Sequence, residues 1–186
     1  MKEIVWHGRG GQGVVVASSI FGTALAIYGG KYALSIPSFG GQRRDAPLIA
    51  VTRVSEEPIR RRDRQADPDY IVILDDSLVS EVLKGLSPDK PRHIIVNSKR
   101  SAADLGLASR DSATIVDAAE IASKVLKSPI TNTVMVGVFA AASGLASLDS
   151  LKKAITDVMP PEISQKNIAA AEAGFTEARS QRATRN

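Results

Sequence analysis

Cysteine is missing from all 186 residues of this sequence. Without thiolates the chain can form no disulfide, no cysteine-ligated zinc site and no cysteine-held iron–sulfur cluster. Histidine is scarce as well: His7 and His93 are the only two, and their separation leaves no compact metal-ligand motif. We therefore expect the chain to form no metal site of its own.

Aromatic residues make up only 4% of the chain, so the core must be built mainly from Ala, Val, Ile and Leu. The longest apolar stretch, residues 134–142, is too short to span a bilayer, and no secretory segment follows Met1. The net charge of +4 is too small to indicate nucleic-acid binding by itself. We expect one soluble, cytoplasmic domain over residues 1–186, with neither a membrane nor a nucleic acid as partner.

One glycine-rich segment stands near the start of the chain and reads Gly8-Arg9-Gly10-Gly11-Gln12-Gly13. It follows a short apolar run and precedes a helical pattern over 14–26. A strand, a glycine loop and a helix form the opening unit of a nucleotide-binding α/β domain. Glycines permit a sharp turn and the close approach of another group, and the first N–H groups of a helix suit an anion. The alternative is a tight turn that only packs the helix on the sheet.

The glycine spacing fits the dinucleotide fingerprint, but the acidic residue expected about 20 positions later is missing. No Asp or Glu occurs between Glu3 and Asp45, so a standard NAD site lacks its ribose ligand. The loop also lacks the Lys-Ser/Thr ending of a P-loop. His7 could serve as an acid–base group or simply end a strand, and no Ser-His-Asp order is present. We identify no catalytic residue, and a self-sufficient catalyst is hard to build from this sequence.

The hydrophobic pattern predicts an α/β fold. Continuous apolar runs such as 70–74 are typical of strands covered on both faces, and the last third of the chain has helical spacing. We predict a three-layer α/β/α domain with a Rossmann-like, mostly parallel sheet, a hairpin between the second and third strands, and a frayed tail over 180–186. After the opening strand, the expected strands cover 32–36, 48–54, 70–74, 93–97 and 113–117, and the expected helices cover 14–26, 78–86, 118–126, 132–143, 148–158 and 163–179.

Two arginine-rich stretches are candidate binding segments. Residues 37–47 combine glycines, one aromatic residue and the pair Arg43-Arg44, which suits either a binding loop or a solvated connection. Residues 59–64 hold four arginines, which could meet phosphates or an acidic partner. A solvated face stabilised by nearby acids explains the second stretch equally well. The acids at 75–76 resemble a ribose or metal site only superficially, because helix capping accounts for them.

Four segments, in this order, carry a resemblance to a known family. They are the glycine loop with its two valines (8–15), the loop 37–47, the phrase Thr52-Arg53-Val54-Ser55-Glu56-Glu57-Pro58-Ile59-Arg60, and the pattern Asn132-Thr133-x-Met135-x-Gly137. Over nearly its whole length the chain resembles the gamma subunits of pyruvate:ferredoxin oxidoreductase (pyruvate synthase) and related 2-oxoacid:ferredoxin oxidoreductases. The phrase at 52–60 is more similar to pyruvate-type gamma chains than to indolepyruvate-type beta chains.

The resemblance implies a reaction in which a 2-oxoacid and coenzyme A give an acyl-coenzyme A, carbon dioxide and reduced ferredoxin. It implies that alpha, beta and delta subunits are the partners. Thiamine diphosphate with magnesium and the [4Fe-4S] clusters are then expected in those subunits, which agrees with the lack of cysteine here. The gamma chain is expected to dock on the catalytic subunits, to help hold coenzyme A, and to be inactive alone.

The resemblance also points to cofactor-binding residues. Gln42 stands where the family often has an acid, and Asp45 where it often has glycine, so Asp45 adds a negative charge to the second loop. A free-standing nucleotide-dependent oxidoreductase and a basic nucleic-acid-binding module remain as alternatives, although the arginine stretch lacks aromatic residues for base stacking. Asn132 is expected to cap its helix. The candidate cofactor-binding residues are Gly8, Arg9, Gly10, Gly11, Gln12, Gly13, Ser38, Arg43, Arg44 and Asn132.

Overall fold

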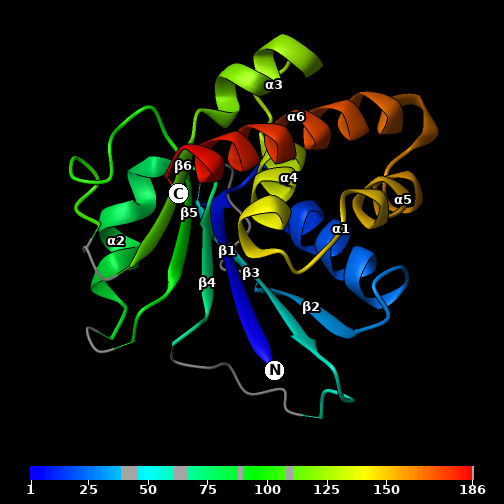
Figure 1. The fold of residues 1–186 in the computed structure, drawn as a ribbon, viewed down its shortest axis with the longest axis horizontal. Helices are drawn as coiled ribbons and strands as arrows, with labels where there is room; N and C mark the ends of the chain where they lie inside the picture. The colour runs from blue at the N-terminus through cyan, green and yellow to red at the C-terminus, as the bar shows by residue number, and fades with distance from the viewer. Residues whose placement is uncertain (39–45, 61–66, 88–89, 108–110, 186) are drawn as a thin grey trace.

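The computed structural model describes residues 1–38, 46–60, 67–87, 90–107 and 111–185. These residues form the series of strands followed by helices that the hydrophobic pattern predicts (Figure 1). In chain order the elements are β1 (Lys2–Arg9), α1 (Val14–Ala26), β2 (Tyr32–Ser38), β3 (Pro47–Ser55), β4 (Tyr70–Ile73), the 3-10 helix η1 (Asp76–Leu78), α2 (Val79–Lys84), β5 (His93–Asn97), β6 (Ser112–Val116), α3 (Ala118–Leu126), α4 (Asn132–Ser143), α5 (Leu148–Val158) and α6 (Pro161–Arg185).

The six strands form one sheet in the order β2-β3-β1-β4-β5-β6. The pairs β1–β4, β4–β5 and β5–β6 are parallel, whereas β3 runs antiparallel to both β1 and β2. The mostly parallel sheet and the β2–β3 hairpin are therefore confirmed. Because β1, β4, β5 and β6 point the same way, their carboxyl ends meet at one edge, where open α/β sheets bind ligands.

Helices cover both faces of the sheet. Successive side chains of a strand point to opposite faces, so one strand contributes to two cores. Val72 of β4 joins Ile4 and Trp6 of β1 in a large core shared with α1, α4, α5 and α6. Its neighbours Ile71 and Ile73 belong to a smaller core with η1 and α2 on the opposite face. The predicted three-layer α/β/α arrangement is confirmed, and Figure 1 shows α2 apart from the group formed by α1, α4, α5 and α6.

Three of the aromatic residues, Trp6, Phe21 and Phe139, gather at the centre of the large core. The ring centroids of Trp6 and Phe139 are 5.3 Å apart, and those of Phe21 and Phe139 are 4.7 Å apart. The indole Nε1 of Trp6 donates a 3.0 Å hydrogen bond to Thr52 Oγ1, which satisfies its polar atom inside the core. β1, β3, α1 and α4 are thus held around one cluster.

Helices α4 and α6 pack with their backbones almost in contact. A Cβ atom on Gly137 of α4 would overlap the carbonyl oxygen of Ala171, and one on Gly174 of α6 would overlap that of Val134. Glycine at these two positions allows the close approach. Figure 1 shows α6 running alongside α4. This arrangement builds a dense core from small side chains, in keeping with the shortage of aromatic residues.

The last helix is longer than predicted. Helix α6 runs from Pro161 to Arg185 rather than over 163–179. Proline suits the first helical position, where its missing N–H has no intrahelical partner to lose. Near the other end, Gln181 Nε2 donates to Glu177 Oε1 at 3.1 Å, one turn earlier. Buried Ala178 holds this last part of the helix against the molecule.

Other boundaries shift by a few residues. Asp117 is outside β6, because its side chain caps α3 by accepting from Glu120 N at 2.9 Å. The predicted helix over 78–86 is a 3-10 turn followed by the short α2. β2 extends past Pro37, a residue that edge strands tolerate. Within the described part of the chain, no helix is long and apolar enough to cross a membrane.

Candidate functional site

The glycine loop joins the carboxyl end of β1 to the start of α1, as predicted. Gly11 and Gly13 have φ angles of 92° and 79°, in the left-handed region that favours glycine. Gly13 is also the N-cap residue of α1 and gives the helix no side-chain cap. The loop therefore turns sharply at the sheet edge where parallel α/β proteins bind their ligands.

The loop is packed against the start of α4. A Cβ atom on Gly13 would lie 2.8 Å from Asn132 Cγ, so only glycine fits beside that side chain. Asn132 is buried, and its Oδ1 accepts from Thr133 N at 2.9 Å. The expectation that Asn132 caps the helix is wrong, because Thr131 is the N-cap residue and Asn132 is the first helical residue. The structure nevertheless brings Gly13 and Asn132 together across more than 100 residues of sequence.

Side chains tie the loop to the end of β4. Gln12 Oε1 accepts from Arg9 N at 2.7 Å, and Gln12 Nε2 donates to Asp75 Oδ2 at 2.9 Å. Arg9 Nε also donates to Asp75 Oδ2, at 3.2 Å, and Arg9 Nη2 donates to Ser77 Oγ at 2.8 Å. Asp75 caps η1 as predicted, since its Oδ1 accepts from Ser77 N at 3.1 Å. Its link to the glycine loop was missed from the sequence.

The Asp75 carboxylate is held in its charged form. Partial burial acts to raise the pKa of this group, but the hydrogen bonds from Ser77 and Gln12 and the positive charge of Arg9 outweigh it. The net effect places the pKa of Asp75 below its ordinary value. The site therefore contains a fixed negative charge next to the loop, engaged by donors from both β1 and η1.

Several loop N–H groups lack an acceptor in the described part of the chain. Gly10 N donates to Ala46 O at 2.9 Å and Gln12 N to Arg9 O at 3.1 Å, but no acceptor lies opposite the N–H groups of Gly11, Gly13 and 14–16. The first turn of α1 contains no acidic residue. Free N–H groups and the positive end of a helix dipole together form a site suited to binding an anion.

A pocket of about 220 Å³ adjoins the loop between the sheet and α2. Gly8 and His7 of β1 line it, together with Leu48 of β3 and Leu78 and Val82 across from them. Most of the pocket wall is apolar, so the pocket is better suited to binding an uncharged part of a ligand than to acid–base chemistry. His7 thus lines a pocket within β1 rather than ending the strand, and its acid–base role stays a hypothesis.

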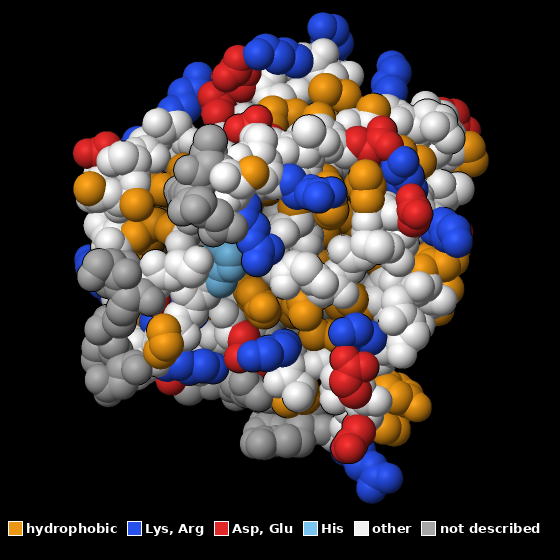
Figure 2. Space-filling view, in the orientation of Figure 1, with side chains coloured by type: hydrophobic (Ala, Val, Ile, Leu, Met, Phe, Trp, Pro, Cys, Tyr) orange, Lys and Arg blue, Asp and Glu red, His pale blue; other side chains and the backbone are white. Residues whose placement is uncertain are grey.

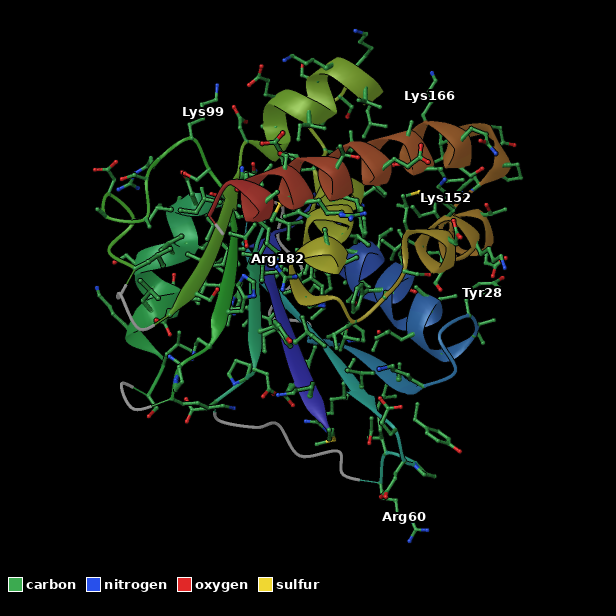
Figure 3. The ribbon with its side chains drawn as sticks, viewed as in Figure 1. Tyr28, Arg60, Lys99, Lys152, Lys166 and Arg182 are labelled. Carbon is green, nitrogen blue, oxygen red and sulfur yellow. The ribbon has the colours of Figure 1, made fainter. Side chains whose placement is uncertain are left out.

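Of the remaining predicted site residues, Ser38 lies two strands away from the glycine loop at the same end of the sheet, and the others fall outside the described residues. Ser38 ends β2, where it pairs with Ile49. Arg43 and Arg44 fall outside the described residues, as do positions 61–64 of the second arginine stretch. Arg60 lies at the end of the molecule where β1 begins, opposite the glycine loop (Figure 3). Among the described residues, no three His, Asp or Glu side chains gather to hold a metal ion.

Charge is mixed over the face seen in Figure 2. Basic and acidic side chains alternate across it, and the described residues form no continuous basic surface there. A protein that tracks a nucleic-acid backbone needs such a surface. The face in view therefore lends no support to the nucleic-acid alternative, and positions 61–64 of its arginine stretch lie outside the described residues.

Comparison with known proteins decides the family. The model of the pyruvate ferredoxin/flavodoxin oxidoreductase family matches residues 3–177. The chain belongs to that family. It is 44% identical over 179 residues to the pyruvate synthase subunit PorC of Methanothermobacter marburgensis, covering 94% of this chain and 96% of the relative.

Two further matches agree with this assignment. The chain is 42% identical to the protein named pyruvate/ketoisovalerate oxidoreductases common subunit gamma in Pyrococcus abyssi, over 94% of this chain and 96% of that one. The crystal structure of pyruvate oxidoreductase subunit PORC from Thermotoga maritima superposes with a TM-score of 0.78 at 31% identity, covering 94% of this chain and 95% of that chain. The predicted membership among the gamma subunits of this oxidoreductase family is confirmed. All three matches are named as subunits, which does not favour a free-standing enzyme.

Proposed function

We propose that this chain is the gamma subunit of a complex that converts pyruvate and coenzyme A to an acyl-coenzyme A, carbon dioxide and reduced ferredoxin. Residues 1–186 act as one unit that docks on alpha, beta and delta subunits in the cytoplasm. Those subunits hold thiamine diphosphate, magnesium and [4Fe-4S] clusters, and ferredoxin accepts the electrons. The names of the relatives support the complex, and the lack of cysteine supports the division of labour.

The choice of 2-oxoacid is made outside this chain. The Pyrococcus abyssi relative is named as common to pyruvate and ketoisovalerate oxidoreductases, so one gamma subunit there serves enzymes with different substrates. Pyruvate is the substrate proposed here because several relatives are named pyruvate synthase subunits.

The gamma chain contributes a binding site for the phosphates of coenzyme A, which we call the phosphate seat. The observation that carries this role is the set of loop N–H groups, from Gly11, Gly13 and 14–16, with no acceptor among the described residues. Coenzyme A carries anionic phosphates joined to an uncharged arm. The apolar pocket of about 220 Å³ beside Gly8 suits that uncharged arm. Arg43 and Arg44 of the second loop are proposed to reach further phosphate oxygens.

A matched pair of variants at Gly11 tests this role. Gly11 is exposed, a Cβ atom there meets nothing within 4 Å, and both Asn and Asp tolerate its left-handed backbone. Gly11→Asp and Gly11→Asn therefore differ only by one negative charge on the seat. Two like charges 4 Å apart repel by about 4 kcal/mol at an effective dielectric constant of 20.

The complex is assembled anaerobically with each variant and assayed for dye reduction at varied coenzyme A. We expect Gly11→Asp to raise the KM for coenzyme A at least about tenfold above that of Gly11→Asn, with the pyruvate KM unchanged. Equal coenzyme A KM values in the two variants would remove the phosphate seat from the glycine loop. Thermal unfolding of both chains controls for a folding defect.

A further inference from the structure

The glycine loop is anchored differently on its two sides. Toward β3, backbone contacts continue to the end of β1, where Gly10 N donates to Ala46 O at 2.9 Å. Toward β4, the backbone ladder stops earlier, at the 2.8 Å hydrogen bond from Leu74 N to His7 O. Beyond that point, in the described part of the chain, side chains connect the loop to the segment that follows β4: the Asp75 carboxylate accepts from Arg9 and Gln12, and Arg9 Nη2 donates to Ser77 Oγ at 2.8 Å.

Asp75 accepts four hydrogen bonds with two oxygen atoms. Oδ2 accepts from Arg9 Nε at 3.2 Å and Gln12 Nε2 at 2.9 Å. Oδ1 accepts from Ser77 N at 3.1 Å and Ser77 Oγ at 2.6 Å. The bond to Gln12 fixes the orientation of its amide, which leaves Gln12 Oε1 to accept from Arg9 N at 2.7 Å. The carboxylate thus acts on the loop backbone through the Gln12 side chain.

We propose that Asp75 is a positioning residue that sets the glycine loop in its anion-binding conformation. The inference rests on the proposed phosphate seat and adds a residue from the segment after β4, the N-cap residue of η1, that the loop motif does not include. Asp75 does not touch the anion. It holds Arg9 and Gln12 to the β4 side, which fixes the backbone of the loop that carries the remaining N–H groups. Arg9 then supports the loop rather than binding phosphate.

The direction in which anion binding changes when Asp75 loses its charge distinguishes a positioning role from a purely electrostatic one. A carboxylate near a phosphate repels it, so its removal alone should strengthen anion binding. Loss of positioning should weaken anion binding, because the N–H groups are no longer held in place. Asp75→Asn is well suited to the test, since an amide offers one acceptor oxygen where the site supplies donors to both. Its NH₂ group would face the donors of Ser77 or those of Arg9 and Gln12.

Asp76 supplies the matched control. It is the next residue, and its Oδ2 accepts from Ser98 Oγ at 2.6 Å rather than from the loop. Asp76→Asn therefore removes the same charge from nearly the same place. The Asn oxygen can still accept from a hydroxyl, so the contact to Ser98 is kept.

The experiment compares both variants in the assembled complex. We expect Asp75→Asn to raise the KM for coenzyme A about tenfold, the loss typical of a broken charge-assisted hydrogen-bond network, with kcat at saturating coenzyme A nearly unchanged. Asp76→Asn should leave that KM unchanged or lower it. An Asp75→Asn complex with an unchanged or lower KM for coenzyme A would overturn the inference.

Amide hydrogen exchange of the full chain gives a second readout that does not involve coenzyme A. Exchange at Arg9, Gly10 and Gln12, whose N–H groups are hydrogen-bonded within the loop or to Ala46, should be faster in Asp75→Asn than in the wild type and in Asp76→Asn. Unchanged exchange would overturn the positioning role whatever the kinetics show. If the two Gly11 variants bind coenzyme A equally, the phosphate seat fails, and faster exchange in Asp75→Asn alone still supports Asp75 as the residue that positions the loop.

Discussion

Glu3 and Arg53 form an ion pair inside the molecule. They lie opposite each other on β1 and β3, with Arg53 Nε 2.8 Å from Glu3 Oε2 and side-chain exposures of 1% and 0% for Arg53 and Glu3. Removal of one partner from a buried pair leaves an uncompensated charge, whereas removal of both can cost little. A slip of one residue between β1 and β3 would also move the two side chains to opposite faces of the sheet.

Arg53→Met should therefore lower the free energy of unfolding by about 3–5 kcal/mol. The double variant Glu3→Gln/Arg53→Met should recover much of that loss, because no buried charge remains. Urea unfolding of the three chains measures both effects. Lys124→Ala, which breaks an exposed pair with Glu120 on α3, serves as a control and should leave stability nearly unchanged. A similar small effect in Arg53→Met would contradict the account.

The contact between α4 and α6 predicts a second stability effect. Gly137→Ala places a Cβ atom on the carbonyl oxygen of Ala171, so the helices must separate. We expect a loss of about 1–3 kcal/mol, as for overpacked cores. Gly85→Ala is the control, since a Cβ there meets Val82 O at an ordinary 3.6 Å. Thermal unfolding of both variants should show the melting temperature of Gly137→Ala falling well below that of Gly85→Ala.

The depressed pKa of Asp75 predicts a pH dependence. Partial burial opposes the shift, but Ser77, Gln12 and Arg9 together hold the native pKa below the unfolded value. The carboxylate therefore contributes stability at pH values above the ordinary Asp pKa, and that contribution is lost as pH falls through the native pKa. The stability difference between wild type and Asp75→Asn should be largest at neutral pH and shrink in acid. A difference that stays constant from neutral to acidic pH would show that the charge of Asp75 is not involved.

The structural features that could be predicted are those encoded by short stretches of consecutive residues. The glycine loop, the apolar strand at 70–74 and the helix over 148–158 each depend on a few consecutive residues, and the structure contains all three. The end of α6 was missed because its polar residues resemble a frayed terminus. Gln, Ala and Arg are good helix formers, and buried Ala178 anchors the preceding turn, so the helix continues to Arg185.

The parts of the site that could not be predicted come from distant segments. Asp75 follows a strand in the position of an ordinary helix cap, and nothing nearby in sequence indicates that Arg9, 66 residues earlier, donates to it. Their contact exists because β1 and β4 are neighbours in the sheet. Asn132 is similar, since only the packing of α4 on the loop shows that its side chain fills the space beside Gly13. Such contacts depend on topology rather than on local pattern.

The most direct test of the central claim is an anaerobic affinity purification of this chain from its native cell. The eluate is assayed for reduction of a viologen dye that depends on both pyruvate and coenzyme A. We predict that larger subunits carrying thiamine diphosphate and iron–sulfur clusters elute with the chain and that the eluate is active. A chain that elutes alone, with no such activity, would contradict its role as a gamma subunit.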